Sequence, residues 1–549
     1  MVAAACLGLA SLLLPGGTAQ ARANEDAALA AYVQARVADS EGDADLAAQR
    51  FAAALALAPD DEMLAARALS QAVAAGNEGV ALTAARTLER LGKLTPEGRL
   101  LLLAEALKAR RWPAAETQAA ELEKDDVFSF MAPILRAWTV AGSGKGDALA
   151  LLAPGKGQSL STAYAAEQRP LVLLLQGRRA EGVAALAPLL QEPGAATERL
   201  RVAAAATLAR RGGRDEALAL LDGGGEAAAR ARAAVAAGKR LPGGIDSPAA
   251  GVADFLVRIA SDLSAQQVPE LALSFARLAA FAAPENSEAW LLAGDLLGAK
   301  GRYSAALAAV GRVAADDPFA GEAAERRLRL LAGSGRTADA IAQGRAAAEA
   351  RPDAESWTRL GGLLTATGRF DEAAQAFGRA LALRSDAKAE PEWALRLLQG
   401  TALTRAGKWA EGREALRQAY RLAPEQPTVL NVLGYSQLER RENLAEAERL
   451  IGEANKLQPD DSAITDSLGW TYYVKGELPR AVELLERAAR GQPADAAINE
   501  HLGDAYYSAG RRYEARYAWR AALVYAEGGA ADRLRAKIDG GLRPELAAP

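Results

Sequence analysis

The sequence predicts an all-α fold, a right-handed superhelical α-solenoid of stacked helix-turn-helix repeats. One observation is a repeat: the stretches that follow Asp466 and Glu500 carry Leu, Gly, Tyr and Ala at matching positions, 34 residues apart. A fixed period of this length is typical of paired helices that stack side by side. The other observation is composition, because Ala, Leu, Arg and Glu dominate while aromatic residues make up only 5% of the chain.

The charge balance argues against a nucleic-acid partner. Of 549 residues, 65 are basic and 69 are acidic, which gives a formal net charge of −4. The two signs alternate along the chain, as is typical of solvated helix faces. A nucleic-acid-binding protein would be expected to carry a basic stripe or a strongly positive balance.

Residues 1–21 are predicted to be a signal peptide. The apolar run from Val2 to Leu14 is too short to span a bilayer comfortably, and Ala19-Gln20-Ala21 after it resembles an A-x-A cleavage site. No positive segment precedes the run, so the alternatives are a start further upstream or a buried or disordered N-terminal helix. We expect a periplasmic protein, with outer-membrane association as a variant of that prediction.

Cys6 is the only cysteine, so no disulfide is expected within the chain. The stretch from Ala3 to Cys6 faintly resembles a lipoprotein box, although Ala3 replaces the usual leucine and apolar residues follow the cysteine. Contact with a membrane is therefore expected only through lipidation of Cys6 or through a partner.

Residues 24–222 are predicted to form a divergent N-terminal solenoid, because the period survives there while the individual copies fade. One unit is still visible at Gly42, Ala47, Phe51, Ala54 and Pro59. Glycine and proline interrupt the helical pattern at residues 223–251, where we expect a hinge or kinked joint.

Residues 252–528 are predicted to form a regular array. The segment at 252–285 has an apolar stripe of period 3.6 that ends at Pro284, and units in series then run from about Trp290 to Gly528. Residues 529–549 are expected to supply a capping helix and tail, since a solenoid needs a polar unit to close its exposed end.

The residues of the regular array resemble the tetratricopeptide repeat. In the last two copies the matching positions are Leu468, Gly469, Tyr472, Ala481, Leu485 and Ala488, then Leu502, Gly503, Tyr506, Ala515, Trp519 and Ala522. Gly469 and Gly503 stand where the two helices of a pair approach each other, and the absent side chain lets the backbones come close. Leu at position 469 would overpack that contact and cost about 1–3 kcal/mol.

No catalytic, cofactor or metal site is predicted. His501 is the only histidine and Cys6 the only cysteine, which excludes triads, cysteine nucleophiles and zinc sites of the usual kind. His501 stands beside packing residues and is expected to have a structural or surface role. The stretches at 142–147 and 153–159 contain Gly-Lys, but neither fits the phosphate-binding pattern, and both are interpreted as turns.

The resemblance implies that the first helix of each pair forms a concave wall whose free face binds a ligand. The residues on that face are Asn431, Tyr435, Glu439, Asp466, Trp470, Tyr473, Glu500, Asp504 and Tyr507. Aromatic side chains would anchor a peptide or a partner helix, and the acids would select basic or amide-rich segments. The alternative is that Trp470 and Tyr473 pack against neighbouring helices.

We therefore expect a non-catalytic scaffold that binds one or more proteins or peptide segments. The layout resembles bacterial envelope adaptors, some of which deliver cell-wall hydrolases to a processing protease. An assembly component for exopolysaccharide or outer-membrane protein export is the second hypothesis. An enzyme is the third, and it would need a long segment without helical periodicity, which the sequence does not contain.

Overall fold

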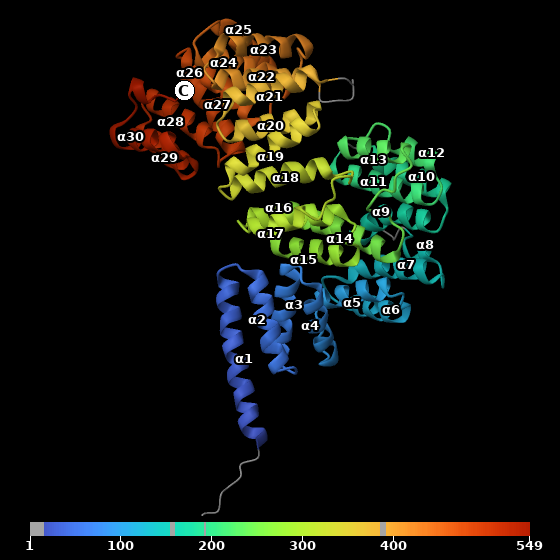
Figure 1. Cartoon of the computed structure of the whole chain (residues 1–549). Coiled ribbons are helices and arrows are strands. Elements are labelled where there is room, and N and C mark those ends of the chain that lie inside the picture. The colour runs from blue at the N-terminus through green and yellow to red at the C-terminus, as the bar shows by residue number, and fades with distance from the viewer. Residues whose placement is uncertain (1–15, 154–159, 192–193, 385–390, 549) are drawn as a thin grey trace, which may run out of the picture. The chain divides into compact units, whose positions relative to one another are not determined.

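The computed structural model describes residues 16–153, 160–191, 194–384 and 391–548. Within these residues the secondary structure is entirely helical, with 30 α-helices and three short 3-10 helices (Figure 1). Consecutive helices pack as antiparallel pairs, which confirms the predicted all-α solenoid of helix-turn-helix repeats. The chain divides into two units, Met1–Arg336 and Thr337–Pro549.

Residues 1–15 lie outside the described residues, so Cys6 and most of the predicted signal peptide stay predictions. The first helix, α1 (Gly16–Ser40), runs through the predicted cleavage site at residues 19–21. Among the helices that the structure describes, none is long and apolar enough to cross a membrane.

Unit 1 runs to the end of the eighteenth helix. Its helices after α1 are α2 (Ala44–Leu57), α3 (Glu62–Ala75), α4 (Glu78–Arg90), α5 (Pro96–Lys108), α6 (Trp112–Leu122), η1 (Ser129–Met131), α7 (Ala132–Ser143), α8 (Ala148–Leu151), α9 (Leu160–Leu175), α10 (Arg179–Leu186), η2 (Ala187–Leu190), α11 (Ala195–Arg210), α12 (Arg214–Leu220), α13 (Glu226–Ala236), α14 (Pro248–Ala265), α15 (Pro269–Ala282), α16 (Ser287–Ala299), α17 (Tyr303–Val310) and α18 (Ala320–Gly333).

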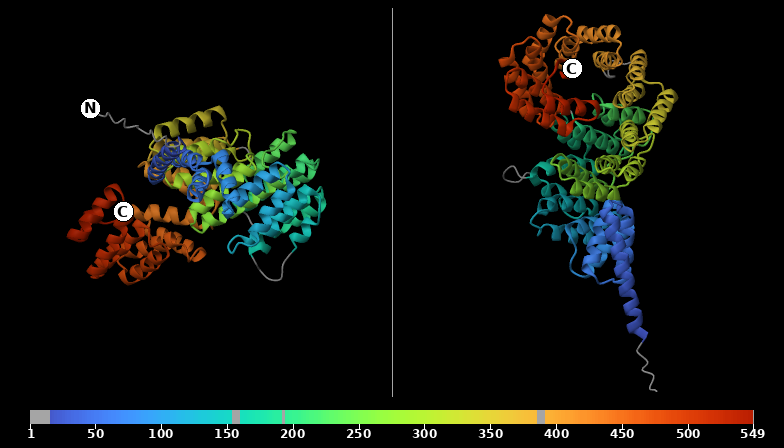
Figure 2. Two further views of the ribbon diagram at one scale, coloured as in Figure 1. Left: turned by 90° about the horizontal axis from the view of Figure 1, so that it is seen from below. Right: turned by 90° about the vertical axis from the view of Figure 1, so that its left-hand side faces the viewer.

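Unit 2 contains the remaining helices. They are α19 (Thr337–Ala350), α20 (Ala354–Ala366), α21 (Phe370–Ala382), α22 (Glu392–Arg405), α23 (Trp409–Leu422), α24 (Pro427–Glu439), α25 (Leu444–Leu457), α26 (Ser462–Val474), α27 (Leu478–Gly491), α28 (Ala496–Ser508), α29 (Arg512–Tyr525), α30 (Gly528–Gly540) and η3 (Pro544–Leu546). Figure 2 shows them following one another around an arc, with the C-terminal end on its inner side.

The last two repeats mark the ends of their first helices with the same residue types. Asp461 and Asp495 precede α26 and α28, and each carboxylate accepts a hydrogen bond from the backbone N–H three residues later. Gly476 and Gly510 end the same two helices in the left-handed conformation, with φ of +80° and +84°. That conformation favours glycine, and it turns the chain sharply into the second helix of the pair.

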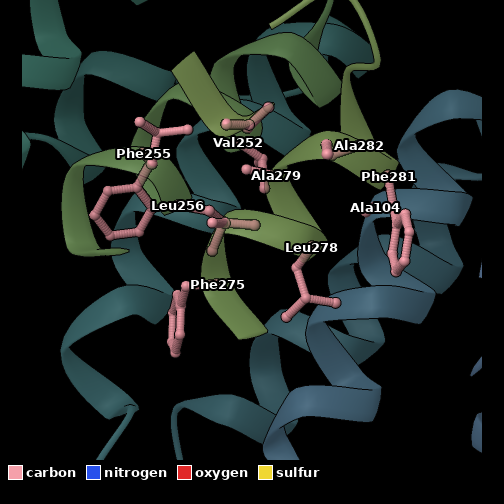
Figure 3. Close-up of a cluster of buried hydrophobic side chains, with 14 of the residues drawn as sticks. Ala104, Val252, Phe255, Leu256, Phe275, Leu278, Ala279, Phe281 and Ala282 are labelled. Carbon is pink, nitrogen blue, oxygen red and sulfur yellow. The ribbon is translucent and has the colours of Figure 1, made fainter. Parts of the chain in front are cut away.

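The helices α14 and α15 fill the inner wall of unit 1. They contact α3, α5, α7 and α9, most of which are the first helices of successive pairs. Phe255, Leu256, Phe275 and Leu278 lie in this core, and Phe281 of α15 lies beside Ala104 of α5 (Figure 3). Every residue of α14 from Pro248 to Val257 is buried, Asp254 included. The unit therefore uses its own chain to occupy the wall that the resemblance assigned to a ligand.

A buried polar network fixes α14 in this position. Arg199 of α11 forms an ion pair with Asp254 of α14, and their side chains are 8% and 2% exposed. Gln168 of α9 donates to Asp254 over 2.9 Å and accepts from the Trp138 indole over 3.0 Å. Three helices of the wall are thus connected to one carboxylate. The joint predicted at 223–251 contains α13 and the loop that leads into α14.

Small residues let the helices of unit 2 approach each other closely. A Cβ atom placed on Gly503 would lie 2.3 Å from Cδ1 of Trp519, and one on Gly469 would lie 2.8 Å from Cγ of Leu485. Such distances require the neighbour to move, and Trp519 is fully buried.

We expect Gly503→Ala to destabilise unit 2, because overpacking a closed core costs about 1–3 kcal/mol and outweighs the gain of about 1 kcal/mol in helix propensity. Gly452→Ala is the matched control, since a Cβ there meets no atom within 4 Å. It should stabilise α25. Urea unfolding of both variants measures the difference, and equal effects would contradict the packing role of Gly503.

Candidate functional site

The nine residues predicted for the concave face lie on α24, α26 and α28. These are the first helices of three successive pairs, and α26 contacts both α24 and α28. Tyr435, Trp470 and Tyr473 share one apolar cluster. The structure therefore brings the residues together along one wall.

Trp470 lies at the centre of an aromatic stack. Its ring is parallel to that of Tyr473 at 4.4 Å on one side and to that of His501 at 4.1 Å on the other. Trp470 is only 3% exposed. It packs against the neighbouring helix α28, as the alternative interpretation of the sequence predicted, and it belongs to the buried cluster of the wall.

His501 forms a buried pair with Asp466 across adjacent repeats. The imidazole Nδ1 lies 2.9 Å from Oδ2 of Asp466, and the two side chains are 4% and 8% exposed. Burial, the largest single influence, opposes the charged imidazole, but the carboxylates of Asp466, Asp504 and Glu500 together outweigh it, so the pKa of His501 is raised above its ordinary value. The histidine is structural, as the sequence indicated.

We expect the single histidine to titrate above its ordinary value of about 6.5. Since the chain contains only one histidine, its imidazole resonances need no assignment. A pKa that is higher in the folded state means that the charged form stabilises unit 2 below pH of about 6.5, and that this contribution is lost as the pH rises through the folded pKa. NMR of imidazole-labelled protein measures the midpoint.

Asp466→Asn is the control for this titration. The largest of the three carboxylate contributions is then lost, so the midpoint should fall below that of the unchanged protein, while Asp504 and Glu500 still act to raise the pKa. An unchanged midpoint in the variant would contradict the assignment of the pKa shift to Asp466.

The acids of the last repeat are engaged by the chain's own C-terminal helix. Lys537 of α30 is fully buried, and its Nζ donates to Glu500 over 2.6 Å and to both oxygens of Asp504 over 2.8 Å. Arg533 of α30 binds Glu500 through two hydrogen bonds of 2.8 Å. Trp519 donates to Asp504 over 2.9 Å. These carboxylates hold the cap in place.

The accessible part of the wall lies on α24. The side chain of Glu439 is 31% exposed, and burial of the remainder raises its pKa. Asn431 Oδ1 is buried and has no hydrogen-bond partner within the described residues. The exposed carboxylate of Glu439 can accept hydrogen bonds from a partner's backbone or side-chain donors.

The sequence alone did not reveal the role of Lys537, Arg533 and the tail. A signal was present, because Glu500 and Asp504 are four residues apart on one helix and Arg533 and Lys537 are four apart on another. Residues at that spacing share a helix face, so two such pairs of opposite charge fit each other.

The described residues contain no group of three or more His, Cys, Asp or Glu side chains that could hold a metal ion. The Gly-Lys stretch at 142–147 forms the turn between α7 and α8, with Gly144 in the left-handed conformation. Most of the second stretch, residues 154–159, lies outside the described residues.

The outer face of α29 carries a second set of large side chains that the sequence analysis did not single out. Tyr513, Tyr517 and Val524 are 79%, 68% and 72% exposed. They lie on one stripe of the helix, at spacings of four and seven residues.

Comparisons with known proteins agree with the repeat pattern. The tetratricopeptide repeat family model matches residues 291–355, 326–390, 397–462 and 467–532. No curated protein matches the sequence.

Similar solved structures include three proteins of helical repeats. A thermophilic TPR protein of Thermus thermophilus is 23% identical, with a TM-score of 0.30, and covers 34% of this chain and 98% of its own. Tom70 of yeast is 12% identical, with a TM-score of 0.38, over 94% and 96%. PilF of Pseudomonas aeruginosa is 18% identical, with a TM-score of 0.31, over 40% and 97%.

Proposed function

We propose that this chain, whose residues 291–532 carry tetratricopeptide repeats, is a non-catalytic scaffold of the bacterial cell envelope. It binds partner proteins on the inner wall of unit 2. The observation that carries the proposal is the difference between the two walls. In unit 1, α14 and α15 fill the inner wall, whereas the α24 part of the wall of unit 2 keeps Glu439 exposed.

The location in the envelope rests on the N-terminal sequence. An apolar run followed by Ala19-Gln20-Ala21 fits export, and a chain with Cys6 as its only cysteine needs no disulfide in the periplasm. Within this proposal, the resemblance to envelope adaptors points to a protease and its cell-wall hydrolase substrates as partners. Mass spectrometry of the mature N-terminus tests export, because an intact Met1 in envelope-purified protein would contradict it.

Affinity capture with matched surface variants tests the binding wall. The full chain is used as bait in envelope extracts, beside Glu439→Arg on the inner wall and Tyr517→Arg on the outer face. Both positions are exposed, so neither change should alter the fold. We expect the Glu439 variant to recover at least about 10-fold less of each partner. Reversing a charge at an interface weakens binding, and each ~1.4 kcal/mol of lost binding free energy raises the dissociation constant tenfold.

The Tyr517 variant should recover the partners unchanged. Equal recovery by the Glu439 variant, or loss only in the Tyr517 variant, would overturn the assignment of the inner wall.

A further inference from the structure

The last residues of the described chain fold back onto the inner wall of unit 2. After α30 ends at Gly540, residues 541–548 (called the tail below) pass along α28 and reach α26. Gly541 is buried beside Tyr507, close enough that a Cβ on it would lie 2.4 Å from the Tyr507 hydroxyl. Ala548 is 8% exposed and belongs to the apolar cluster of Trp470, Tyr435 and Tyr473.

The tail is anchored by one backbone group. The N–H of Ala548 donates to Oδ2 of Asp504 over 2.8 Å, in a buried position. In the part of the chain that the structure describes, no second hydrogen bond joins the tail to the repeats. Arg543, Pro544, Glu545 and Ala547 are exposed. At its start the tail is also held by Gly541, buried beside Tyr507, and by Leu542, which packs in the apolar cluster of Trp519. The rest of it, residues 543–548, is held by one hydrogen bond and one small buried side chain, and this part can be displaced.

We infer that the tail is a built-in occupant of the binding wall, which a partner's segment of the same chemistry must displace. This inference rests on the proposed function and specifies its ligand. The tail lies against five of the nine predicted wall residues, Tyr435, Trp470, Tyr473, Asp504 and Tyr507, and leaves the Glu439 end of the wall open.

The site that Ala548 occupies beside Trp470 and Asp504, called the seat below, defines the chemistry of the partner segment. Ala548 is 8% exposed and belongs to the same apolar cluster as Trp470, Leu438 and Ile451, so a small residue fits there and a large or charged one does not. Asp504 already receives the Lys537 ammonium, so what remains for the partner is an acceptor for a neutral backbone N–H. The partner residue is therefore small and is not proline, which lacks that N–H.

A tethered tail competes strongly with a free segment. A short connection to α30 gives the tail an effective concentration in the millimolar range, so a free peptide below about that concentration scarcely enters the occupied seat. Removal of the tail removes the competitor, and the apparent dissociation constant then falls to its intrinsic value.

The probe is a labelled synthetic peptide of residues 542–549, Leu-Arg-Pro-Glu-Leu-Ala-Ala-Pro. Its binding is measured by fluorescence polarisation to the full chain and to a chain that ends at Gly541, which keeps α30 and Lys537. We expect binding to the shortened chain at least about 10-fold tighter than to the full chain. The peptide that carries Ala548→Arg should not bind the shortened chain.

A full-length chain with Ala548→Arg provides a second arm that does not depend on the shortened chain folding. The substitution displaces the end of the tail from the seat without deleting the tail. This chain should therefore bind the unchanged peptide as tightly as the shortened chain does. Lack of binding to either opened chain, or equal binding of the two peptides, would overturn the inference. If the peptide does not bind but the Glu439→Arg variant loses its partners, the tail is only a cap and the proposed function stands. If the peptide binds but the Glu439→Arg variant keeps its partners, the proposed function is wrong.

Discussion

Lys537→Met is expected to destabilise the C-terminal end of unit 2 by about 3–5 kcal/mol, because removing one partner of a buried ion pair leaves the other charge uncompensated. Lys537 is 0% exposed and lies between Glu500 and Asp504, of which Asp504 is also 0% exposed. Burial already raises the pKa of Asp504, and the lysine is what opposes that shift most. Methionine keeps the volume and removes only the charge.

Hydrogen exchange of backbone amides in α28 and α30 measures this loss as a local opening free energy. Lys537→Met combined with Asp504→Asn is the control. It neutralises Asp504, the carboxylate that loses its cation, whereas Glu500 keeps its ion pair with Arg533. The double variant should regain about half of the loss, since neutral replacements of buried ion pairs are often tolerated. A single variant that loses less than about 1 kcal/mol would contradict the role of Lys537 as the centre of the cap.

Asp254→Ala is expected to have a comparable effect in unit 1, with a loss of about 3–5 kcal/mol. The change strands the buried guanidinium of Arg199 and the Gln168 amide, which donates to Asp254 over 2.9 Å. Glu288 lies 3.5 Å from Nε of Arg199 and compensates part of the charge, so the lower end of the range is expected. Burial raises the pKa of Glu288 to about 8, so this compensation weakens below that pH as the carboxyl is protonated.

Glu285→Ala is the matched control for Asp254→Ala. Glu285 also forms an ion pair with an arginine, Arg210, but its side chain is 60% exposed. Exposed pairs contribute about 0–1 kcal/mol, so this variant should unfold in urea almost like the unchanged protein. If both variants lost the same free energy of unfolding, burial would not determine how much the Asp254 network contributes to stability.

Local sequence patterns were sufficient to predict the fold class. The 34-residue period recurs from copy to copy and the composition favours helices, so neither observation depends on how distant segments pack. The packing of α14 and α15 against α5 and α7 could not be predicted in this way. Those contacts join residues more than 100 positions apart, and the apolar pattern of residues 252–282 shows only that the segment is buried.

The sequence predicted where the candidate residues lie, but not which groups their side chains contact. The repeat register placed Trp470, Glu500 and Asp504 on one wall, since equivalent positions of successive repeats share a face. The register carries no information on what covers that wall. The pairing of the two acids with Lys537 and Arg533 depends on where α30 folds, and the seat of Ala548 depends on the tail that follows it.

Site-specific photo-crosslinking tests most directly the claim that partners bind the inner wall of unit 2. A photoreactive side chain is placed in the full chain at position 439 on α24, or at position 517 on the outer face of α29, and irradiated in envelope extracts. The account predicts crosslinked partners from position 439 and not from position 517. Partners crosslinked from position 517 alone would contradict it and would assign binding to the outer tyrosine stripe.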